Sequence, residues 1–465
     1  MSKRRRGGSS QAELFSRSKR PTIAIEENHR LVALADKLDW TEMEVRAEVI
    51  RASKLKSAAG RPPRLRALLG AMVLRATRYQ PYRVLADQIR HYAPARYLCG
   101  LTETDWSPDH NTIHDFIEQM GEEGTRFINE YAVGWAVEEQ LADSSVLVAD
   151  TTAQEATFPY PNEMGLMAAF MTTVAAACKK GGQALKGFVE KAATKFASAS
   201  EKVREYRLFA KTKTKAVKDR MTEELATLVE GVQRQLGQAL QSAAASKQRL
   251  GKYARLATAK VTQLHETMKK LVPQIRYWLK TGFVAADKII SLHIPELYSI
   301  VRGKVGKTVE FGLTWGIRRL KGGYLLASVA TNRRELVDAK FAVKAVEDHI
   351  ALFGKAPTAY AYDRGGWSAP NVASLRMLGV KHVGLAPRGK AEWKVSGRMK
   401  TQLVSERAQV EGGIGTLKCS KYGFNRPAAR SAEMMGACGQ LATLGFNLNK
   451  LVRELAKRER QVLVG

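Results

Sequence analysis

The chain has 465 residues, a mass of 51.4 kDa and a hydrophobic content of 45%, which suits a water-soluble protein of two or three domains. Lys and Arg outnumber Asp and Glu by 75 to 45, which gives a formal net charge of +30. This excess predicts a polyanionic partner, for which nucleic acid is the simplest choice. No apolar run approaches the length of about 18 residues that a membrane span needs, and no signal-peptide pattern follows the basic start. We therefore expect a cytoplasmic protein that binds nucleic acid and no membrane.

The cysteines and histidines give a weak metal signal. The four cysteines lie far apart and form no CxxC pair, so we expect buried free thiols in place of a zinc cluster or a disulfide. They are Cys99, Cys178, Cys419 and Cys438. His110 and His114 stand four residues apart, the spacing of two metal ligands on one helical face. The Asn and Thr between them also fit a helix start, which is our preferred interpretation.

The N-terminal third is expected to be basic and helical. Residues 1–27 combine a basic cluster with Gly and Ser, and they predict a disordered arm that touches phosphates. Residues 28–134 contain helical stretches separated by Gly, Pro or polar breaks, and they predict an all-α domain for DNA binding or dimerisation. The alternative is a structural bundle whose charged faces are only solvated. The arginines expected on its basic surface are Arg61, Arg64, Arg66, Arg75 and Arg83.

Short apolar segments from residue 144 onward predict a mixed α/β sheet within 135–465. SSVLVAD (144–150) predicts a strand that ends at Asp150, and the segments 308–319 and 324–331, joined by LKGG, predict a hairpin. A helix, the strand TAYAYD ending at Asp363, a helix, the strand KHVGLA and another helix follow. In a sheet of this strand order the first and fourth strands can be neighbours.

A helical insertion at about 162–290 is expected to interrupt this sheet. Met221, Leu225, Leu228, Val232 and Leu236 recur at steps of three and four, which predicts a long amphipathic helix. Residues 179–280 contain 23 basic and 8 acidic side chains, a net charge of +15. A helical pair that only supports dimerisation would have the same apolar stripe, so the charge excess favours a DNA-contacting arm.

Three acids in separate segments are candidate metal ligands. A pair of Mg²⁺ ions can activate an oxygen nucleophile and neutralise a leaving oxygen in phosphodiester chemistry. A few carboxylates on rigid elements hold such a pair, because Mg²⁺ prefers hard oxygen ligands. Asp150, Asp363 and Glu411 fit this role, with Glu406 and Glu310 as rival third acids.

The segment RAQVEGGIGTLK carries a recognisable spacing. Arg407 and Glu411 have three residues between them, and Glu411 and Lys418 have six, so all three can line one helical face. This resembles the Y-(2)-R-(3)-E-(6)-K signature of bacterial DDE insertion-sequence transposases, with Val404 at the tyrosine position. The segments at 60–74 and 107–121, YDRGG and GFNLNKL resemble other stretches of that family, and the resemblance spans most of the chain outside the insertion.

The resemblance implies an RNase H-like catalytic fold that binds two Mg²⁺ ions, with Mn²⁺ as a substitute, through Asp150, Asp363 and Glu411. It implies a DNA transposase, associated with the nucleoid, that cleaves transposon ends and transfers the freed strand into target DNA. A homodimer or larger complex would then act on double-stranded DNA. The DNA-contacting side chains are expected to include Arg407, Lys418, Arg364, Arg61 and Arg64. The rival interpretations are an RNase H-like nuclease or resolvase and a non-catalytic DNA-binding protein.

Overall fold

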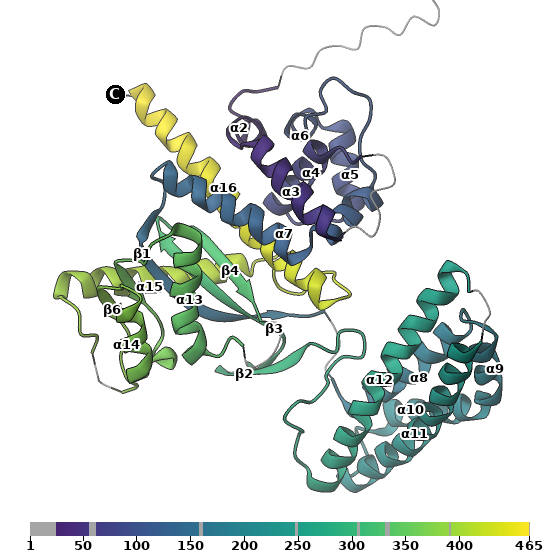
Figure 1. The fold of residues 1–465 in the computed structure, drawn as a ribbon. Helices are drawn as coiled ribbons and strands as arrows, with labels where there is room; N and C mark the ends of the chain where they lie inside the picture. The colour runs from purple at the N-terminus through teal and green to yellow at the C-terminus, as the bar shows by residue number, and fades with distance from the viewer. Residues whose placement is uncertain are drawn as a thin grey trace, which may run out of the picture.

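The computed structural model describes residues 25–54, 62–157, 161–246, 250–304, 307–330, 335–389 and 392–464. It is a mixed α/β structure in which one sheet lies between N-terminal helices and a separate helical block (Figure 1). The first 24 residues of the predicted basic arm lie outside the described residues, as does Arg61. In the part of the chain that the structure describes, no helix combines the length and apolar character needed to cross a membrane.

The structure describes six helices in the N-terminal part, within residues 25–54 and 62–138. They are α2 (Arg30–Lys37), α3 (Trp40–Lys54), α4 (Leu65–Thr77), α5 (Tyr82–His91), α6 (Ala93–Leu98) and α7 (His110–Glu138). Helix α4 is buried from Ala67 to Thr77, because the other helices and the C-terminal helix surround it. Asp109 caps α7 by accepting a hydrogen bond from the backbone N of Thr112 at 2.8 Å. The segment that contains the histidine pair is therefore the start of a helix, with the cap one residue before His110.

The sheet contains six strands. They are β1 (Asp143–Glu155), β2 (Tyr298–Lys304), β3 (Lys307–Lys321), β4 (Leu325–Val329), β5 (Ala359–Ala361) and β6 (His382–Gly384). Their order is β2-β3-β1-β5-β6, and β4 also pairs with β3. Pairing is antiparallel between β3 and its three neighbours and parallel from β1 to β5 to β6. The structure confirms the predicted hairpin, which is β3–β4, and the predicted contact between the first and fourth strands, which are β1 and β5.

Two features of the sheet differ from the sequence prediction. Strand β1 does not end at Asp150 but continues to Glu155, because the polar residues that follow Asp150 remain paired with β3 as far as Gly312. Strand β2 was not predicted, and it pairs with the first half of β3 while β4 pairs with the second half. The continuation of β1 depends on β3, a partner strand more than 100 residues away in sequence, so local pattern did not reveal it.

The two faces of the sheet are covered by different helices, and alternate residues of each strand point to opposite faces. Helices α13 (Asp338–Phe353) and α14 (Ala369–Met377) belong to one side, where Leu147 and Tyr360 join the core that contains Phe341 of α13. Helix α15 (Gly397–Leu417) covers the other face, where Val148 and Ala361 join the core that contains Val410. A polar side chain of β1 or β5 therefore points either toward α13 or toward α15, according to its position in the alternation.

The edge of the sheet at β4 is closed by side chains of α7 and of α16 (Ala432–Val464), which lie side by side (Figure 1). Asn447 accepts a hydrogen bond from the backbone N of Leu325 at 2.9 Å and donates to its O at 2.7 Å. Asn129 also donates to Leu325 O, and Gln440 donates to Ala327 O. Because these amides are buried, they satisfy strand-edge groups that water cannot reach.

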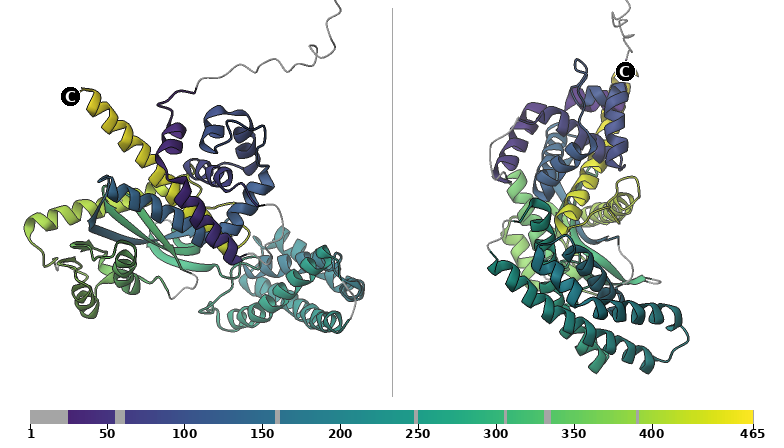
Figure 2. Two further views of the ribbon diagram at one scale, coloured as in Figure 1. Left: turned by 45° about the horizontal axis from the view of Figure 1, so that its top comes forward. Right: turned by 90° about the vertical axis from the view of Figure 1, so that its right-hand side faces the viewer.

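The helical block follows β1 and has its own hydrophobic core. Its helices are α8 (Glu163–Cys178), α9 (Gln183–Lys191), α10 (Ala193–Phe209), α11 (Lys215–Ala245) and α12 (Lys252–Thr281). They form a bundle to one side of the sheet (Figure 2). The predicted amphipathic helix is α11, in which Met221, Leu225, Val232 and Leu236 are buried. Acidic residues of α11 pair within the block, Glu224 with Lys202 and Glu230 with Arg276. Residues 179–280 hold 23 basic but only 8 acidic side chains, so the block keeps an excess of positive charge.

Candidate active site

Asp150 and Asp363 lie on the α15 side of the sheet. The parallel ladder between β1 and β5 pairs Val148 with Ala361, and both side chains join the α15 core. Asp150 and Asp363 each follow two residues later, so strand alternation places them on the same face as Val148 and Ala361. Adjacent strands are about 4.8 Å apart, so the two aspartates leave the sheet as near neighbours.

Each aspartate is oriented by a nearby backbone N–H. The backbone N of Thr151 donates to Oδ1 of Asp150 at 2.8 Å. Asp363 caps the short helix η1 (Arg364–Gly366), and its Oδ1 accepts from the backbone N of Gly365 at 3.1 Å. Both side chains are half-buried, so the sheet supports them while solvent still reaches the site.

Helix α15 brings Arg407 and Glu411 to Asp363. Nη2 of Arg407 lies 3.9 Å from Oδ1 of Asp363 and 4.0 Å from Oε1 of Glu411. One helical turn separates Arg407 from Glu411, which places both on one face of α15. The Glu411 side chain is 65% exposed and the Asp363 side chain 46%, so these ion pairs are open to solvent.

The three carboxylates could serve as ligands for hard cations. Three carboxylates supply only oxygen ligands, which Mg²⁺ and Mn²⁺ accept. Their ligand atoms are not all within 4.8 Å of one another, and His114, Asp115 and Glu118 are the one such group among the residues that the structure describes. Two ions about 3.5 to 4 Å apart need ligands spread over a wider span than one ion does. Asp363 and Glu411 already attract one positive group, the guanidinium of Arg407.

The two rival third acids do not lie at the candidate site: Glu406 is paired elsewhere and Glu310 is distant. Glu406 forms a buried ion pair with Arg319 of β3, which also donates to Gln409. Glu310 is buried in β3, seven residues from Ile317, the partner of Asp150 in β1. Seven residues of strand span about 24 Å, so Glu310 is remote from Asp150. Of the three acids considered for the third position, Glu411 is the one beside Asp363.

The other residues predicted to bind DNA are spread over two regions. Lys418 is the C-cap of α15, about 10 Å along the axis from Glu411. Arg364 follows Asp363 and donates to the backbone O of Pro387 at 3.3 Å. Arg64 is exposed at the start of α4 with its guanidinium 4.6 Å from the Trp106 ring. Arg75, predicted for the basic surface, is instead buried between the rings of two tyrosines, which its guanidinium stacks on.

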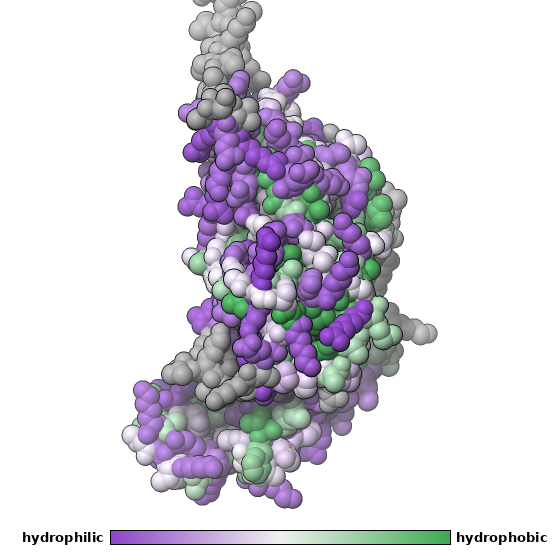
Figure 3. All heavy atoms as spheres, turned by 90° about the vertical axis from the view of Figure 1, so that its left-hand side faces the viewer, coloured by the Kyte–Doolittle hydropathy of each residue, from purple (hydrophilic) through white to green (hydrophobic). Residues whose placement is uncertain are grey.

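Two exposed hydrophobic side chains flank the carboxylates. Val404, at the signature's tyrosine position, is 52% exposed on α15, and Trp367 is 39% exposed after η1. The exposed ring of Trp367 is available for stacking on an unpaired base. The side of the molecule that carries β6, α14 and α15 shows many hydrophilic side chains with hydrophobic groups between them (Figure 3). A polar ligand can therefore approach this side.

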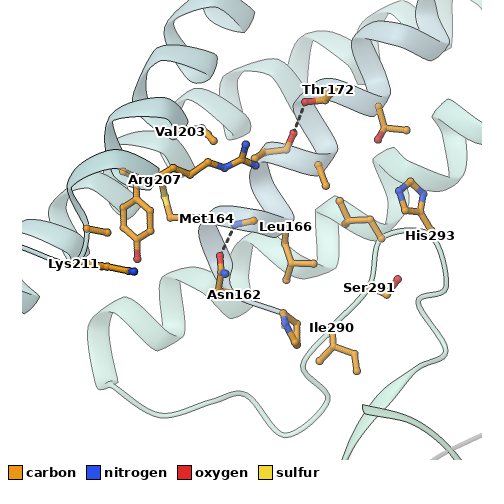
Figure 4. A pocket seen from close by; sticks show the side chains of 18 residues that line it. Asn162, Met164, Leu166, Thr172, Val203, Arg207, Lys211, Ile290, Ser291 and His293 are labelled. Carbon is orange, nitrogen blue, oxygen red and sulfur yellow. Dashed lines mark hydrogen bonds between the residues drawn. The ribbon is translucent and has the colours of Figure 1, made fainter. Parts of the chain in front are cut away.

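A concave site lies in the helical block, away from the carboxylates. A cavity of about 700 Å³ opens between α8, α10 and the segment 290–293. Met164, Leu166 and Ile290 give it apolar walls, and Arg207 and Lys211 lie at its rim (Figure 4). None of the three predicted carboxylates lines it. The cavity therefore adds no side chain to the candidate active site.

Comparison with known proteins identifies one segment. Residues 21–119 match the family model of a transposase domain (DUF772), which covers α2 to α6 and the first part of α7. The match supports a transposase, an enzyme class that binds and cleaves DNA. No curated protein and no solved structure matches the chain. All three predicted carboxylates lie outside the matched segment, so their role rests on the geometry of the sheet and α15.

Proposed function

We propose that this transposase cleaves transposon ends by metal-dependent hydrolysis and then transfers the freed strand into target DNA. The observations that carry the proposal are the ion contacts of Arg407 with Asp363 and Glu411, and the β1–β5 pairing that brings the segments of Asp150 and Asp363 together. These residues come from three elements and carry the spacing expected of a DDE transposase. The transposase-domain match at 21–119 is independent support.

We propose that Asp150, Asp363 and Glu411 hold two Mg²⁺ or Mn²⁺ ions. When bound, such ions make water a nucleophile at neutral pH and neutralise the leaving oxygen of the phosphodiester. The three side chains would hold the ions in a fixed place on the protein. Asp150 and Asp363 are oriented by backbone N–H groups, and Glu411 lies on a helix that packs against the sheet. Arg407 and Lys418 lie on the same helix and offer positive charge to the phosphates on either side of the cleaved bond.

The sheet and its flanking helices are proposed to form an RNase H-like core. A three-stranded antiparallel unit of β1, β3 and β4 is followed by the parallel strands β5 and β6, with α13 and α15 on opposite faces. This order supports the proposal because it pairs the middle of the first strand, just before Asp150, with the end of the fourth strand, just before Asp363. Strand β2 and the block α8–α12 are additions to that core.

Double-stranded DNA is the proposed substrate and partner. The net charge of +15 over residues 179–280 supports contact between the helical block and phosphates, since opposing charge and counterion release drive such binding. Arg64 and Arg364 extend the basic surface toward the N-terminal helices and the carboxylates. A homodimer or larger complex would pair two transposon ends.

The test is cleavage and joining of DNA that carries the element's ends, with and without Mg²⁺ or Mn²⁺. Asp150→Asn, Asp363→Asn and Glu411→Gln should each lose at least about 100-fold in cleavage rate while retaining DNA affinity, because each removes one ligand charge. Glu118→Gln is the matched control, since it neutralises an exposed acid of the one compact group of metal-type side chains among the described residues. Loss of activity in Glu118→Gln with retention in the other three would reject the proposed site.

Two further outcomes separate the rival functions. Cleavage without joining of the freed end to a second DNA would indicate a nuclease or resolvase that uses the same acids. Salt-dependent DNA binding with no metal-dependent cleavage by the wild type would indicate a non-catalytic DNA-binding protein.

A further inference from the structure

The backbone ladder between β1 and β5 ends before it reaches the two aspartates. Val148 and Ala361 are the last paired residues, and Asp150 and Asp363 each lie two positions beyond them. Beyond Ala361 the chain hydrogen-bonds to the other neighbour, since the backbone N of Tyr362 donates to Gly384 O at 3.3 Å. Contacts beyond the β1–β5 ladder therefore contribute to the spacing between Asp150 and Asp363.

Asp338, the first residue of α13, connects the two chain segments at this level. Its Oδ1 accepts a hydrogen bond from Oγ1 of Thr151 at 2.8 Å and another from the hydroxyl of Tyr362 at 3.0 Å. Thr151 directly follows Asp150, and Tyr362 directly precedes Asp363. One carboxylate oxygen thus joins the immediate neighbours of both aspartates from the α13 side of the sheet.

The partners of Asp338 are themselves held firmly. Tyr362 is fully buried, and its ring packs edge-on against Phe341 of α13 with centroids 6.1 Å apart. Burial, followed by the charge of Asp338, raises the pKa of the Tyr362 hydroxyl.

The loop after Asp363 also rests on the start of α13. A Cβ added to Gly365 would lie 2.8 Å from Oδ2 of Asp338, so the loop backbone packs directly against this carboxylate. Asn371 of α14 donates to Ala339 O at 2.7 Å and to Gly366 O at 2.8 Å. The loop that carries Asp363 is thereby attached to the first turn of α13.

We infer that Asp338 is a positioning residue that fixes the distance between Asp150 and Asp363 and so sets the affinity of the metal site. It acts through Thr151 and Tyr362 as a hydrogen-bond acceptor. This inference rests on the proposed function for the identity of the site. The sequence offered no sign of it, because Asp338 is an ordinary acid in the first turn of a helix.

The test compares Asp338→Ala with Asp338→Asn, whose amide oxygen still accepts both hydroxyl donors. Mn²⁺ affinity, measured by electron paramagnetic resonance, should fall about 10- to 100-fold in Asp338→Ala, the range for lost outer-shell partners of a metal site. Asp338→Asn should stay within about threefold of the wild type, because geometry and not charge is what Asp338 supplies. Thr151→Val and Tyr362→Phe each remove one of the two hydroxyl donors. Their Mn²⁺ affinities should lie between those of Asp338→Asn and Asp338→Ala.

Controls separate positioning from a general loss of stability. Glu347→Ala removes an exposed acid from the same helix and should leave Mn²⁺ affinity unchanged. Hydrogen exchange should rise in the segments around residues 151 and 363 in Asp338→Ala while the α11 and α12 segments keep their protection. Equal losses of Mn²⁺ affinity in Asp338→Asn and Asp338→Ala, or no loss in either, would overturn the inference.

Failure of the proposed function would look different. A wild type that neither binds Mn²⁺ nor cleaves DNA would reject the metal site, whereas the exchange measurement would still report whether Asp338 ties the two segments. Unchanged exchange at both segments in Asp338→Ala would overturn the positioning role by itself.

Discussion

Nη2 of Arg407 lies 3.9 Å from Oδ1 of Asp363, so a positive side chain stands among the carboxylates that we propose to bind metal. We expect Arg407→Gln to raise Mn²⁺ affinity about threefold, because two solvent-exposed ion pairs compete weakly with the metal. The same variant should lower DNA cleavage at least about tenfold through loss of a phosphate contact. Titration with Mn²⁺ and single-turnover cleavage measure the two effects separately.

Arg407→Lys is the matched control for this prediction. It keeps the positive charge and should restore the wild-type Mn²⁺ affinity, while its single ammonium replaces only part of the phosphate contact. A fall in Mn²⁺ affinity in Arg407→Gln would instead mean that Arg407 orders the carboxylates and does not compete for them.

Truncation of Glu406 is expected to lower the stability of the chain far more than truncation of Glu411, five residues further along α15. Glu406→Ala leaves the buried Arg319 guanidinium without its carboxylate and should lower the free energy of unfolding by about 3 to 5 kcal/mol. Glu411→Ala should change that free energy by less than about 1 kcal/mol, because its ion pair is exposed. Denaturant unfolding of both variants makes the comparison. Equal destabilisation would contradict the separate roles assigned to these acids.

His349 should make stability depend on pH. Burial and the nearby Arg318 lower the pKa of His349 from 6.5 to about 4. Between these values the unfolded chain takes up a proton that the folded chain excludes, so stability falls as the solution is acidified. The loss attributable to His349 should reach about 3 kcal/mol at pH 4. Urea unfolding between pH 7 and 4 measures it.

His349→Gln isolates this contribution, since glutamine does not titrate. The difference in unfolding free energy between wild type and variant should narrow as the pH falls from 6.5 to 4. A difference that stays constant over this interval would show that His349 remains neutral in the unfolded chain or charged in the folded one.

Two glycines in long helices should differ sharply when replaced by alanine. A Cβ on Gly445 of α16 would lie 1.7 Å from the backbone O of Ala76 in α4, so Gly445→Ala must separate two packed helices. We expect a loss of at least about 3 kcal/mol in the free energy of unfolding, in the upper range for overpacking. Gly412 of α15 has open space around it, and Gly412→Ala should stabilise the chain by about 0.5 to 1 kcal/mol. Thermal unfolding distinguishes the two, and a stable Gly445→Ala would contradict the close contact of α4 with α16.

The sequence was sufficient where the physical cause is local. Alternating and 3.6-residue patterns predicted the β3–β4 hairpin, the strand before Asp363 and the long helix α11, because side-chain periodicity follows from backbone geometry. The one-turn spacing of Arg407 and Glu411 likewise predicted that both lie on one face of a helix. The excess of basic residues predicted a polyanionic partner without any knowledge of the fold.

Tertiary structure decided which polar residues meet. The sequence could not assign Glu406 to Arg319, which precedes it by 87 residues, or link Asp338 to Thr151, which precedes it by 187. It also placed Asp150 at the end of a strand that continues to Glu155. These outcomes depend on strand register and on which helix covers each face, and such long-range pairings are determined by packing of the whole chain and not by local pattern.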